Sequence, residues 1–94
     1  MRLELSREAQ ADLDDIRDYS VAQFGVPRAI AYLDAVEQAF RRVLDFPEIG
    51  AVRPELAGVR SLGCQQHRLF YTVDGETIRI VRILHKAMDV EQWL

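Results

Sequence analysis

Residues 77–89 read Thr-Ile-Arg-Ile-Val-Arg-Ile-Leu-His-Lys-Ala-Met-Asp. Successive side chains of a strand point to opposite faces, and this stretch places apolar residues on both faces. One face is predicted to carry Ile78, Ile80, Arg82 and Leu84, and the other Arg79, Val81, Ile83 and His85. A strand of this kind is expected inside a sheet that is at least partly covered on each side.

The whole chain has the size and composition of one globular domain, spanning residues 1–94. It is 49% hydrophobic and 29% charged, as in ordinary folded proteins. The start lacks the apolar segment of a signal peptide and no stretch is long enough to cross a membrane, so a cytoplasmic protein without a membrane partner is expected. The lone cysteine, Cys64, excludes an internal disulfide and a cysteine-based metal site, and neither metal nor cofactor is expected.

The charge is distributed unevenly along the chain. Residues 1–46 hold six arginines against nine acidic residues, and residues 47–94 hold six basic and six acidic residues, which gives the net charge of −3. This balance argues against broad nucleic-acid binding, so no specific nucleic-acid binding by the chain alone is expected. A local cationic site in the second half requires folding to bring its basic residues together. These residues are Arg60, Arg68, Arg79, Arg82 and Lys86.

Two helices are predicted in the first half, after a short strand at residues 2–5. Ser6 suits the N-cap of a helix that ends at Gly25. The second helix begins near Pro27 and runs to about Phe46, which precedes another proline. The apolar stripe of the first helix is Ala9, Leu13, Ile16, Ser20 and Phe24, and that of the second is Ile30, Leu33, Val36, Phe40, Val43 and Leu44. The short link predicts an antiparallel hairpin that buries these stripes against a sheet.

The second half is predicted to supply most of the sheet. Residues 47–58 form a connecting loop, and three strands follow at residues 59–62, 68–73 and 77–85. Asp74-Gly75 is a strong hairpin signal between the last two strands. Asp89 is expected to cap a final turn. The fold class is therefore α+β: an N-terminal strand and an antiparallel helical hairpin packed on one face of a small, mainly antiparallel sheet whose other face is partly open.

A series of short segments recurs in a recognisable order along almost the entire chain. The segments are Ser6-Arg7-Glu8-Ala9 with Asp12-Leu13 and Ile16, Tyr32-Leu33, Phe46-Pro47-Glu48-Ile49-Gly50, Arg60-Ser61-Leu62, His67-Arg68-Leu69-Phe70-Tyr71, and Val81-Arg82-Ile83-Leu84-His85 with Met88-Asp89. Together they resemble the ParE branch of the ParE/RelE toxin superfamily. The resemblance implies the RelE/ParE-like fold and the toxin of a type II toxin–antitoxin module, held in a hetero-oligomer by a ParD-type antitoxin.

Three functions are compatible with this resemblance. ParE-like members inhibit DNA gyrase by binding and perform no chemistry, whereas RelE-like members cut messenger RNA on the ribosome. An inactive relative would act only as an antitoxin-binding corepressor. The strand at residues 59–61 lacks the lysines of RelE, which favours the gyrase inhibitor.

A ribonuclease would need an acid, a base and cations around the phosphate. The candidates for this chemistry are His85, Arg68, Arg82 and Glu48, with Tyr71 competent for part of it. Tyr71 and Phe70 are otherwise predicted to be core residues, and His85 to bond a neighbouring loop. Arg82 is predicted to be tied to a carboxylate such as Asp89 or to a C-terminal group.

Two binding surfaces are predicted for an inhibitor. The terminal segment 86–94 is expected to point outward, and the target contact is assigned to Lys86, Met88, Trp93, Arg82 and His85. A disordered antitoxin would fold over apolar surface beside the helical hairpin and pair its charges at the rim. The antitoxin contact is assigned to Tyr19, Phe24, Arg28, Tyr32, Arg42 and Arg53.

Overall fold

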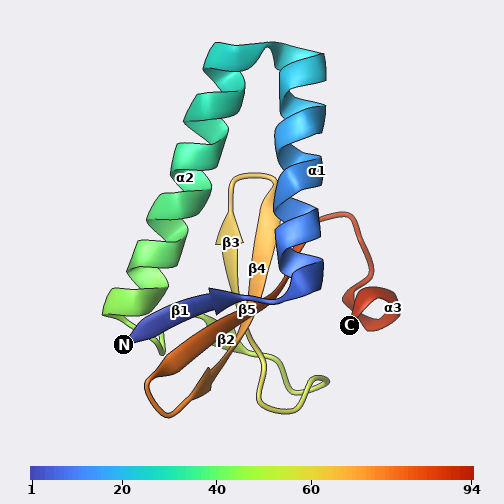
Figure 1. Cartoon of the computed structure of the whole chain (residues 1–94). Coiled ribbons are helices and arrows are strands. Elements are labelled where there is room, and N and C mark those ends of the chain that lie inside the picture. The colour runs from blue at the N-terminus through green and yellow to red at the C-terminus, as the bar shows by residue number, and fades with distance from the viewer.

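The computed structural model describes residues 1–94 as a five-stranded sheet covered on one side by a helical hairpin (Figure 1). The elements are β1 (Arg2–Leu5), α1 (Arg7–Phe24), α2 (Val26–Asp45), β2 (Ala51–Val52), β3 (Arg60–Cys64), β4 (His67–Asp74), β5 (Thr77–His85) and α3 (Val90–Trp93). The strand order is β1-β5-β4-β3-β2, with β1 parallel to β5 and every other pair antiparallel. The predicted fold class is confirmed.

The ends of the helices follow the sequence signals. Ser6 caps α1 by accepting a hydrogen bond from the Ala9 N–H at 2.9 Å. Gly25, at φ +85°, ends α1 and begins α2, because a residue without Cβ adopts this backbone conformation without strain. Two stripe residues, Phe24 and Ile30, are 54% and 55% exposed rather than buried, since the linked ends of the helices project beyond the strands (Figure 1).

The second half differs from prediction at its strand ends. The segment expected to be only a loop contains β2, a two-residue edge strand paired with β3. Strands β3 and β4 extend to a tight turn at Gln65 and Gln66, and Gln65 adopts a positive φ of 55°. Strand β4 reaches Asp74, so the hairpin turn lies at Gly75-Glu76, one residue later than the strongest signal.

A β-bulge in β5 overturns the predicted division of its faces. Phe70 is opposite Arg82 while the next residue of β4, Tyr71, is opposite Ile80, so Val81 is an extra residue. Beyond the bulge the alternation is reversed. Ile83 therefore joins the same core cluster as Ile80, and Leu84 lies on the other face of the sheet.

Each face of the sheet has its own apolar cluster. The larger cluster joins the helices to the sheet and includes Val36, Val43, Leu69 and Tyr71. The smaller one comprises Phe70, Leu84 and Val90, with Met88 packed against it. Phe70 and Tyr71 are 3% and 0% exposed, which confirms both as core residues. The far face is thus covered in part by the C-terminal segment, which the sequence prediction had directed outward.

Candidate functional site

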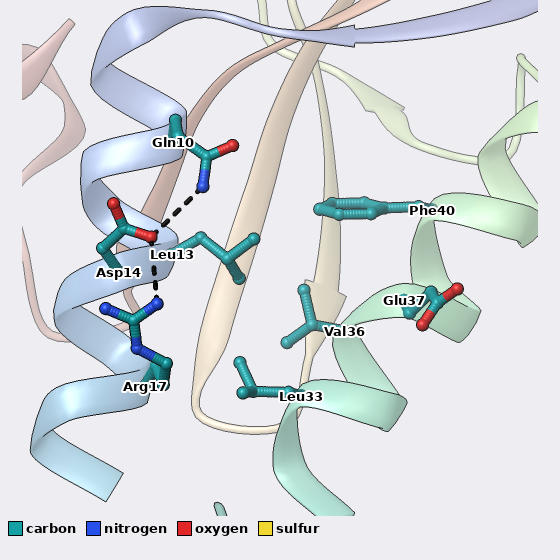
Figure 2. A pocket seen from close by; sticks show the side chains of 8 residues that line it. All are labelled: Gln10, Leu13, Asp14, Arg17, Leu33, Val36, Glu37 and Phe40. Carbon is teal, nitrogen blue, oxygen red and sulfur yellow. Dashed lines mark hydrogen bonds and ion pairs between the residues drawn. The ribbon is translucent and has the colours of Figure 1, made fainter. Parts of the chain in front are cut away.

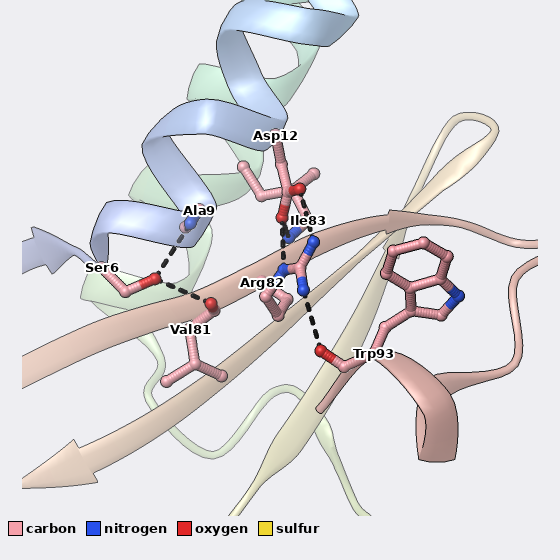
Figure 3. A network of polar contacts seen from close by, with 7 residues as sticks. All are labelled: Ser6, Ala9, Asp12, Val81, Arg82, Ile83 and Trp93. Carbon is pink, nitrogen blue, oxygen red and sulfur yellow. Dashed lines mark hydrogen bonds and ion pairs between the residues drawn. The ribbon is translucent and has the colours of Figure 1, made fainter.

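The site is built at the end of β5, where that strand loses its neighbour. Strand β1 pairs with β5 only as far as Ile80, and side chains of α1 then take over the backbone groups. The Ser6 hydroxyl donates to the Val81 carbonyl at 2.7 Å (Figure 3). The Asp12 carboxylate accepts from the Ile83 N–H at 2.9 Å. Because buried backbone groups need partners, these two side chains close the edge of the strand beside the bulge.

Arg82 is held by this edge on one side and holds the C-terminus on the other. Its Nε and Nη2 donate to the two carboxylate oxygens of Asp12, each at 2.8 Å. Its Nη1 donates to the Trp93 carbonyl at 2.8 Å, and its guanidinium lies 5.8 Å from the Trp93 ring centroid (Figure 3). Hydrogen bonding to Asp12 raises the pKa of Arg82. The side chains of Arg82 and Asp12 are 17% and 13% exposed, so the pair is largely removed from solvent.

Arg82 contacts a C-terminal group, the Trp93 carbonyl, as one of the two predicted alternatives, but the predicted carboxylate Asp89 is not its partner. Asp89 instead caps α3, where its side chain accepts from the Glu91 N–H at 3.1 Å. Asp12 lies in the second turn of α1, beside the open edge of β5, where its carboxylate meets both Arg82 and the Ile83 N–H. The chosen partner lies seventy residues away in sequence, beyond the reach of any local pattern.

The terminal segment is docked at its centre and exposed at its ends. Val90 is 9% exposed and packs in the smaller cluster, and Met88 is half-buried beside it. Lys86 is exposed, and Trp93 keeps 47% of its surface in solvent. The target-binding candidates therefore fall into two groups. Arg82 and Trp93 form one, and His85, Lys86 and Met88 line a common cavity of about 230 Å³.

His85 ends β5 and bonds the following loop, as predicted for a strand-terminal histidine. Its Nδ1 accepts from the Ala87 N–H at 3.0 Å. Its ring lies edge-on to that of His67, 5.4 Å between centroids. His67 Nδ1 in turn lies 2.6 Å from the Tyr32 hydroxyl, which accepts the Gln66 N–H at 3.0 Å. Burial first, and then the charge of His85, lowers the pKa of His67.

The residues proposed for RNA cleavage are not gathered in one place. The Glu48 carbonyl accepts from Arg60, which is opposite Tyr71 in the sheet, whereas His85 is opposite His67. These two rows are four positions apart along β4, roughly 13 Å at about 3.3 Å per residue. Arg68 borders the same cavity as His85 but lies on the sheet face away from the helices, and Arg82 is engaged by Asp12. The structure thus separates Glu48 from His85.

The antitoxin candidates form one compact group and several outliers. Phe24, Arg28 and Tyr32 line a cavity of about 580 Å³ between the helices and the β3–β4 turn. Arg28 stacks on Phe24 at 5.7 Å, and Tyr19 meets Phe24 edge-on at 6.4 Å. Arg42 lies fourteen residues along α2 from Arg28, roughly 21 Å at about 1.5 Å per residue. Arg53, the sixth candidate, lies on the far face of the sheet, where its guanidinium stacks over Phe70.

A groove lies between α1 and α2 that the sequence did not lead us to predict. It has a volume of about 430 Å³ and is lined by Gln10, Leu13, Asp14, Arg17, Leu33, Val36, Glu37 and Phe40 (Figure 2). Figure 2 shows apolar side chains of both helices pointing into the space between them, with charged groups at the rim. The sequence did contain a signal for this groove, because the apolar stripe of α2 is wider than a helix needs for packing against the sheet alone. Sequence reasoning had placed the whole stripe against the sheet.

Comparison with known proteins gives a consistent family. Residues 3–90 match the model of the ParE toxin of type II toxin–antitoxin systems, parDE. Toxin ParE1 of Mycobacterium tuberculosis is 42% identical over 90 residues, covering 94% of this chain and 92% of that protein. Toxin ParE1 of Caulobacter vibrioides is 36% identical over 91 residues, covering 96% and 94%.

Two solved structures share the architecture. A chain of the chromosomal ParDE system of P. aeruginosa has a TM-score of 0.79 and 32% identity, with 90% of this chain and 95% of that chain covered. A chain of the toxin–antitoxin complex RelBE2 of Mycobacterium tuberculosis has a TM-score of 0.64 and 30% identity, with 90% and 96% covered. Sequence and fold agree along the length of the chain, which therefore belongs to the ParE toxin family of type II toxin–antitoxin systems.

Proposed function

We propose that this toxin inhibits DNA gyrase by binding and is neutralised by a ParD-type antitoxin. Membership in the ParE family and the likeness to a solved ParDE system support both parts. Inhibition by binding requires a preformed surface and no assembled acid–base pair. The arrangement at the end of β5 fits that requirement better than it fits RNA cleavage.

The observation that carries the proposal is the engagement of Arg82 by Asp12 and Trp93. An arginine bound to a carboxylate through two hydrogen bonds has little capacity left for a phosphate in a transition state. Its Nη1 group instead donates to the Trp93 carbonyl and holds α3, so that Trp93 is presented on an ordered segment. A half-exposed aromatic side chain on an ordered segment suits a protein-binding surface, where aromatic anchors contribute much of the affinity.

The antitoxin is proposed to fold along the helical hairpin. The groove between α1 and α2 offers Leu13, Leu33 and Phe40 to the apolar face of a partner helix. The cavity lined by Phe24, Arg28 and Tyr32 lies farther toward the linked ends of the helices. The groove offers apolar contacts along the hairpin, and the cavity, on another side of α2, offers a cation for an acidic side chain of the antitoxin.

The gyrase proposal is tested with purified protein and in cells. Wild-type protein is expected to inhibit DNA supercoiling by gyrase, and expression is expected to cause filamentation and a DNA-damage response with intact transcripts. Trp93→Ala and Lys86→Ala are each expected to weaken inhibition at least tenfold. This corresponds to a loss of about 1.4 kcal/mol or more of binding free energy, as is typical when an anchor residue is truncated. Arg41→Ala, which changes an exposed arginine of α2, is the matched control and is expected to inhibit like wild type.

The outcomes separate the three functions. Rapid loss of translation with cut transcripts, abolished by His85→Ala, would replace gyrase inhibition with RNA cleavage. A non-toxic chain that still binds its antitoxin would indicate a corepressor.

A further inference from the structure

The terminal segment begins where β5 ends its pairing with β4. The ladder between these strands stops at His85, which is opposite His67. The next residue, Lys86, is tied through its backbone to the β3–β4 turn, because its N–H donates to the Gln66 carbonyl at 2.9 Å. The end of its side chain lies beside β3, where a Cβ at Gly63 would be 3.9 Å from Nζ. The β3–β4 turn therefore determines where Lys86 lies.

This turn does not have the conformation that its own residues favour. It consists of Gln65 and Gln66, and Gln65 adopts a positive φ of 55°. A residue with a Cβ rarely adopts such a backbone conformation unless the surrounding structure holds it there. The position of the turn thus depends on contacts from outside the β3–β4 hairpin.

The contact that holds the turn comes from α2. The Tyr32 hydroxyl accepts a hydrogen bond from the Gln66 N–H at 3.0 Å and lies 2.6 Å from His67 Nδ1. The Tyr32 and His67 rings meet edge-on, with 5.6 Å between their centroids. Gln66 is therefore bonded to Tyr32 through its N–H and to Lys86 through its carbonyl, so it links the helix to the terminal segment.

We propose that Tyr32 is a positioning residue for target binding: its hydroxyl holds Gln66, and Gln66 holds Lys86 at the start of the terminal segment. This inference rests on the proposed function, in which Lys86 contacts gyrase. Tyr32 lines the cavity on the hairpin, whereas Lys86 lines the cavity on the far face of the sheet. The effect of Tyr32 on the target therefore passes through the turn, and the two proposed partner sites share this side chain.

The test is Tyr32→Phe in the full chain, which removes the hydroxyl and keeps the ring. Amide hydrogen exchange, measured by NMR, is expected to become at least fivefold faster at Gln66 and Lys86, because exchange requires these hydrogen bonds to open. Inhibition of DNA supercoiling by gyrase is expected to weaken at least fivefold, since Lys86 is no longer held in place before binding.

Tyr71→Phe is the matched control. It also removes a tyrosine hydroxyl that makes two hydrogen bonds, in this case to the backbone of Gly50 and Pro47 in another part of the fold. This variant is expected to lose stability, to inhibit gyrase like wild type and to keep the slow exchange at Lys86. Equal weakening of inhibition by both variants would indicate a general loss of stability and would overturn the proposal.

A double-mutant cycle distinguishes positioning from a direct contact. In the Lys86→Ala background, Tyr32→Phe is expected to cause no further loss of inhibition, because the residue that it positions has been removed. A further fivefold loss in that background, or unchanged exchange at Lys86 in Tyr32→Phe, would overturn the proposal. A wild-type chain that does not inhibit gyrase would instead contradict the proposed function, and exchange at Lys86 would still decide whether Tyr32 holds the terminal segment.

Discussion

At the scale of single residues, Asp12 joins three parts of the molecule that are distant in sequence. One carboxylate receives two hydrogen bonds from Arg82 and one from the Ile83 backbone. Arg82 passes the connection on to Trp93. The first helix, the end of β5 and the C-terminus are therefore coupled through one ion pair. Removing one member of such a charged network destabilises the fold strongly, because the other charge is left buried without a partner.

Asp12→Asn is expected to lower the free energy of unfolding by about 2 kcal/mol, because the neutral amide leaves a partly buried guanidinium without its counter-ion. The midpoint of thermal unfolding should fall by roughly 10 °C, as measured by circular dichroism. Asp14→Asn is the control, since its ion pair with Arg17 is exposed at 3.6 Å and contributes little. Equal stability of the two variants would contradict the coupling role of Asp12.

His67 gives the fold a dependence on pH. Its pKa is lowered from 6.5 in the folded chain, so the unfolded chain binds the proton more tightly. The free energy of unfolding therefore has its full value, as far as His67 is concerned, above about pH 6.5, and it decreases as the pH falls below that value. His67→Gln, which keeps an acceptor for Tyr32, is expected to reduce this loss between about pH 6.5 and pH 5. His85→Gln should retain most of it, because burial is the larger cause. An unchanged slope in His67→Gln would refute the assignment.

At the scale of elements, the bulge in β5 is the decisive local feature. The sequence of β5 predicts the bounds of the strand, yet it does not reveal that Val81 is an extra residue. Apolar residues on both faces hide the shift, because either register buries an isoleucine or a leucine on each side. The bulge arises only when β4 pairs with β5, and it determines which face carries Arg82.

The loop after α2 is fixed by a close approach between Gly50 and Tyr71. The Tyr71 hydroxyl accepts from the Gly50 N–H and donates to the Pro47 carbonyl, both at 2.8 Å. A Cβ at position 50 would lie 2.6 Å from that hydroxyl. Glycine is therefore required here by space, and the Pro-Glu-Ile-Gly segment of the sequence acquires a physical explanation.

Gly50→Ala is expected to destabilise the chain by about 2 kcal/mol, since the added methyl group must displace a buried tyrosine or break its hydrogen bond. Urea denaturation monitored by fluorescence measures the change. In Gly63→Ala the nearest atoms to the new Cβ belong to the flexible Lys86 side chain at 3.9 Å. That variant should stay within about 0.5 kcal/mol of wild type. A similar loss in both would argue against the steric explanation.

At the scale of the whole molecule, the sheet separates two surfaces. Hairpin α1–α2 covers one face and leaves exposed apolar side chains at its linked ends, and the C-terminal segment partly covers the other. None of the helices combines the length and the hydropathy that a membrane-spanning segment needs. A partner on the hairpin and a partner on the terminal segment would therefore approach different sides of the molecule.

Phe24→Ala is expected to weaken antitoxin binding at least tenfold, because Phe24 is 54% exposed and borders the proposed antitoxin cavity. Calorimetric titration of the purified toxin with its ParD-type antitoxin measures the affinity. Val52→Ala truncates an apolar side chain of the edge strand β2 that is 62% exposed, and this variant should bind like wild type. A loss with Val52→Ala and none with Phe24→Ala would move the antitoxin site away from the hairpin.

The sequence by itself determined the helices, their glycine link, the last strand and the family, because caps, apolar periods and segment order are local and survive without tertiary contacts. Only the tertiary structure decided the bulge, the pairing of Arg82 with Asp12 and the separation of Glu48 from His85. These features depend on strand register and on contacts across seventy residues, which no local pattern encodes. The stretch at residues 77–89 thus specifies a strand, while its partners specify what that strand presents.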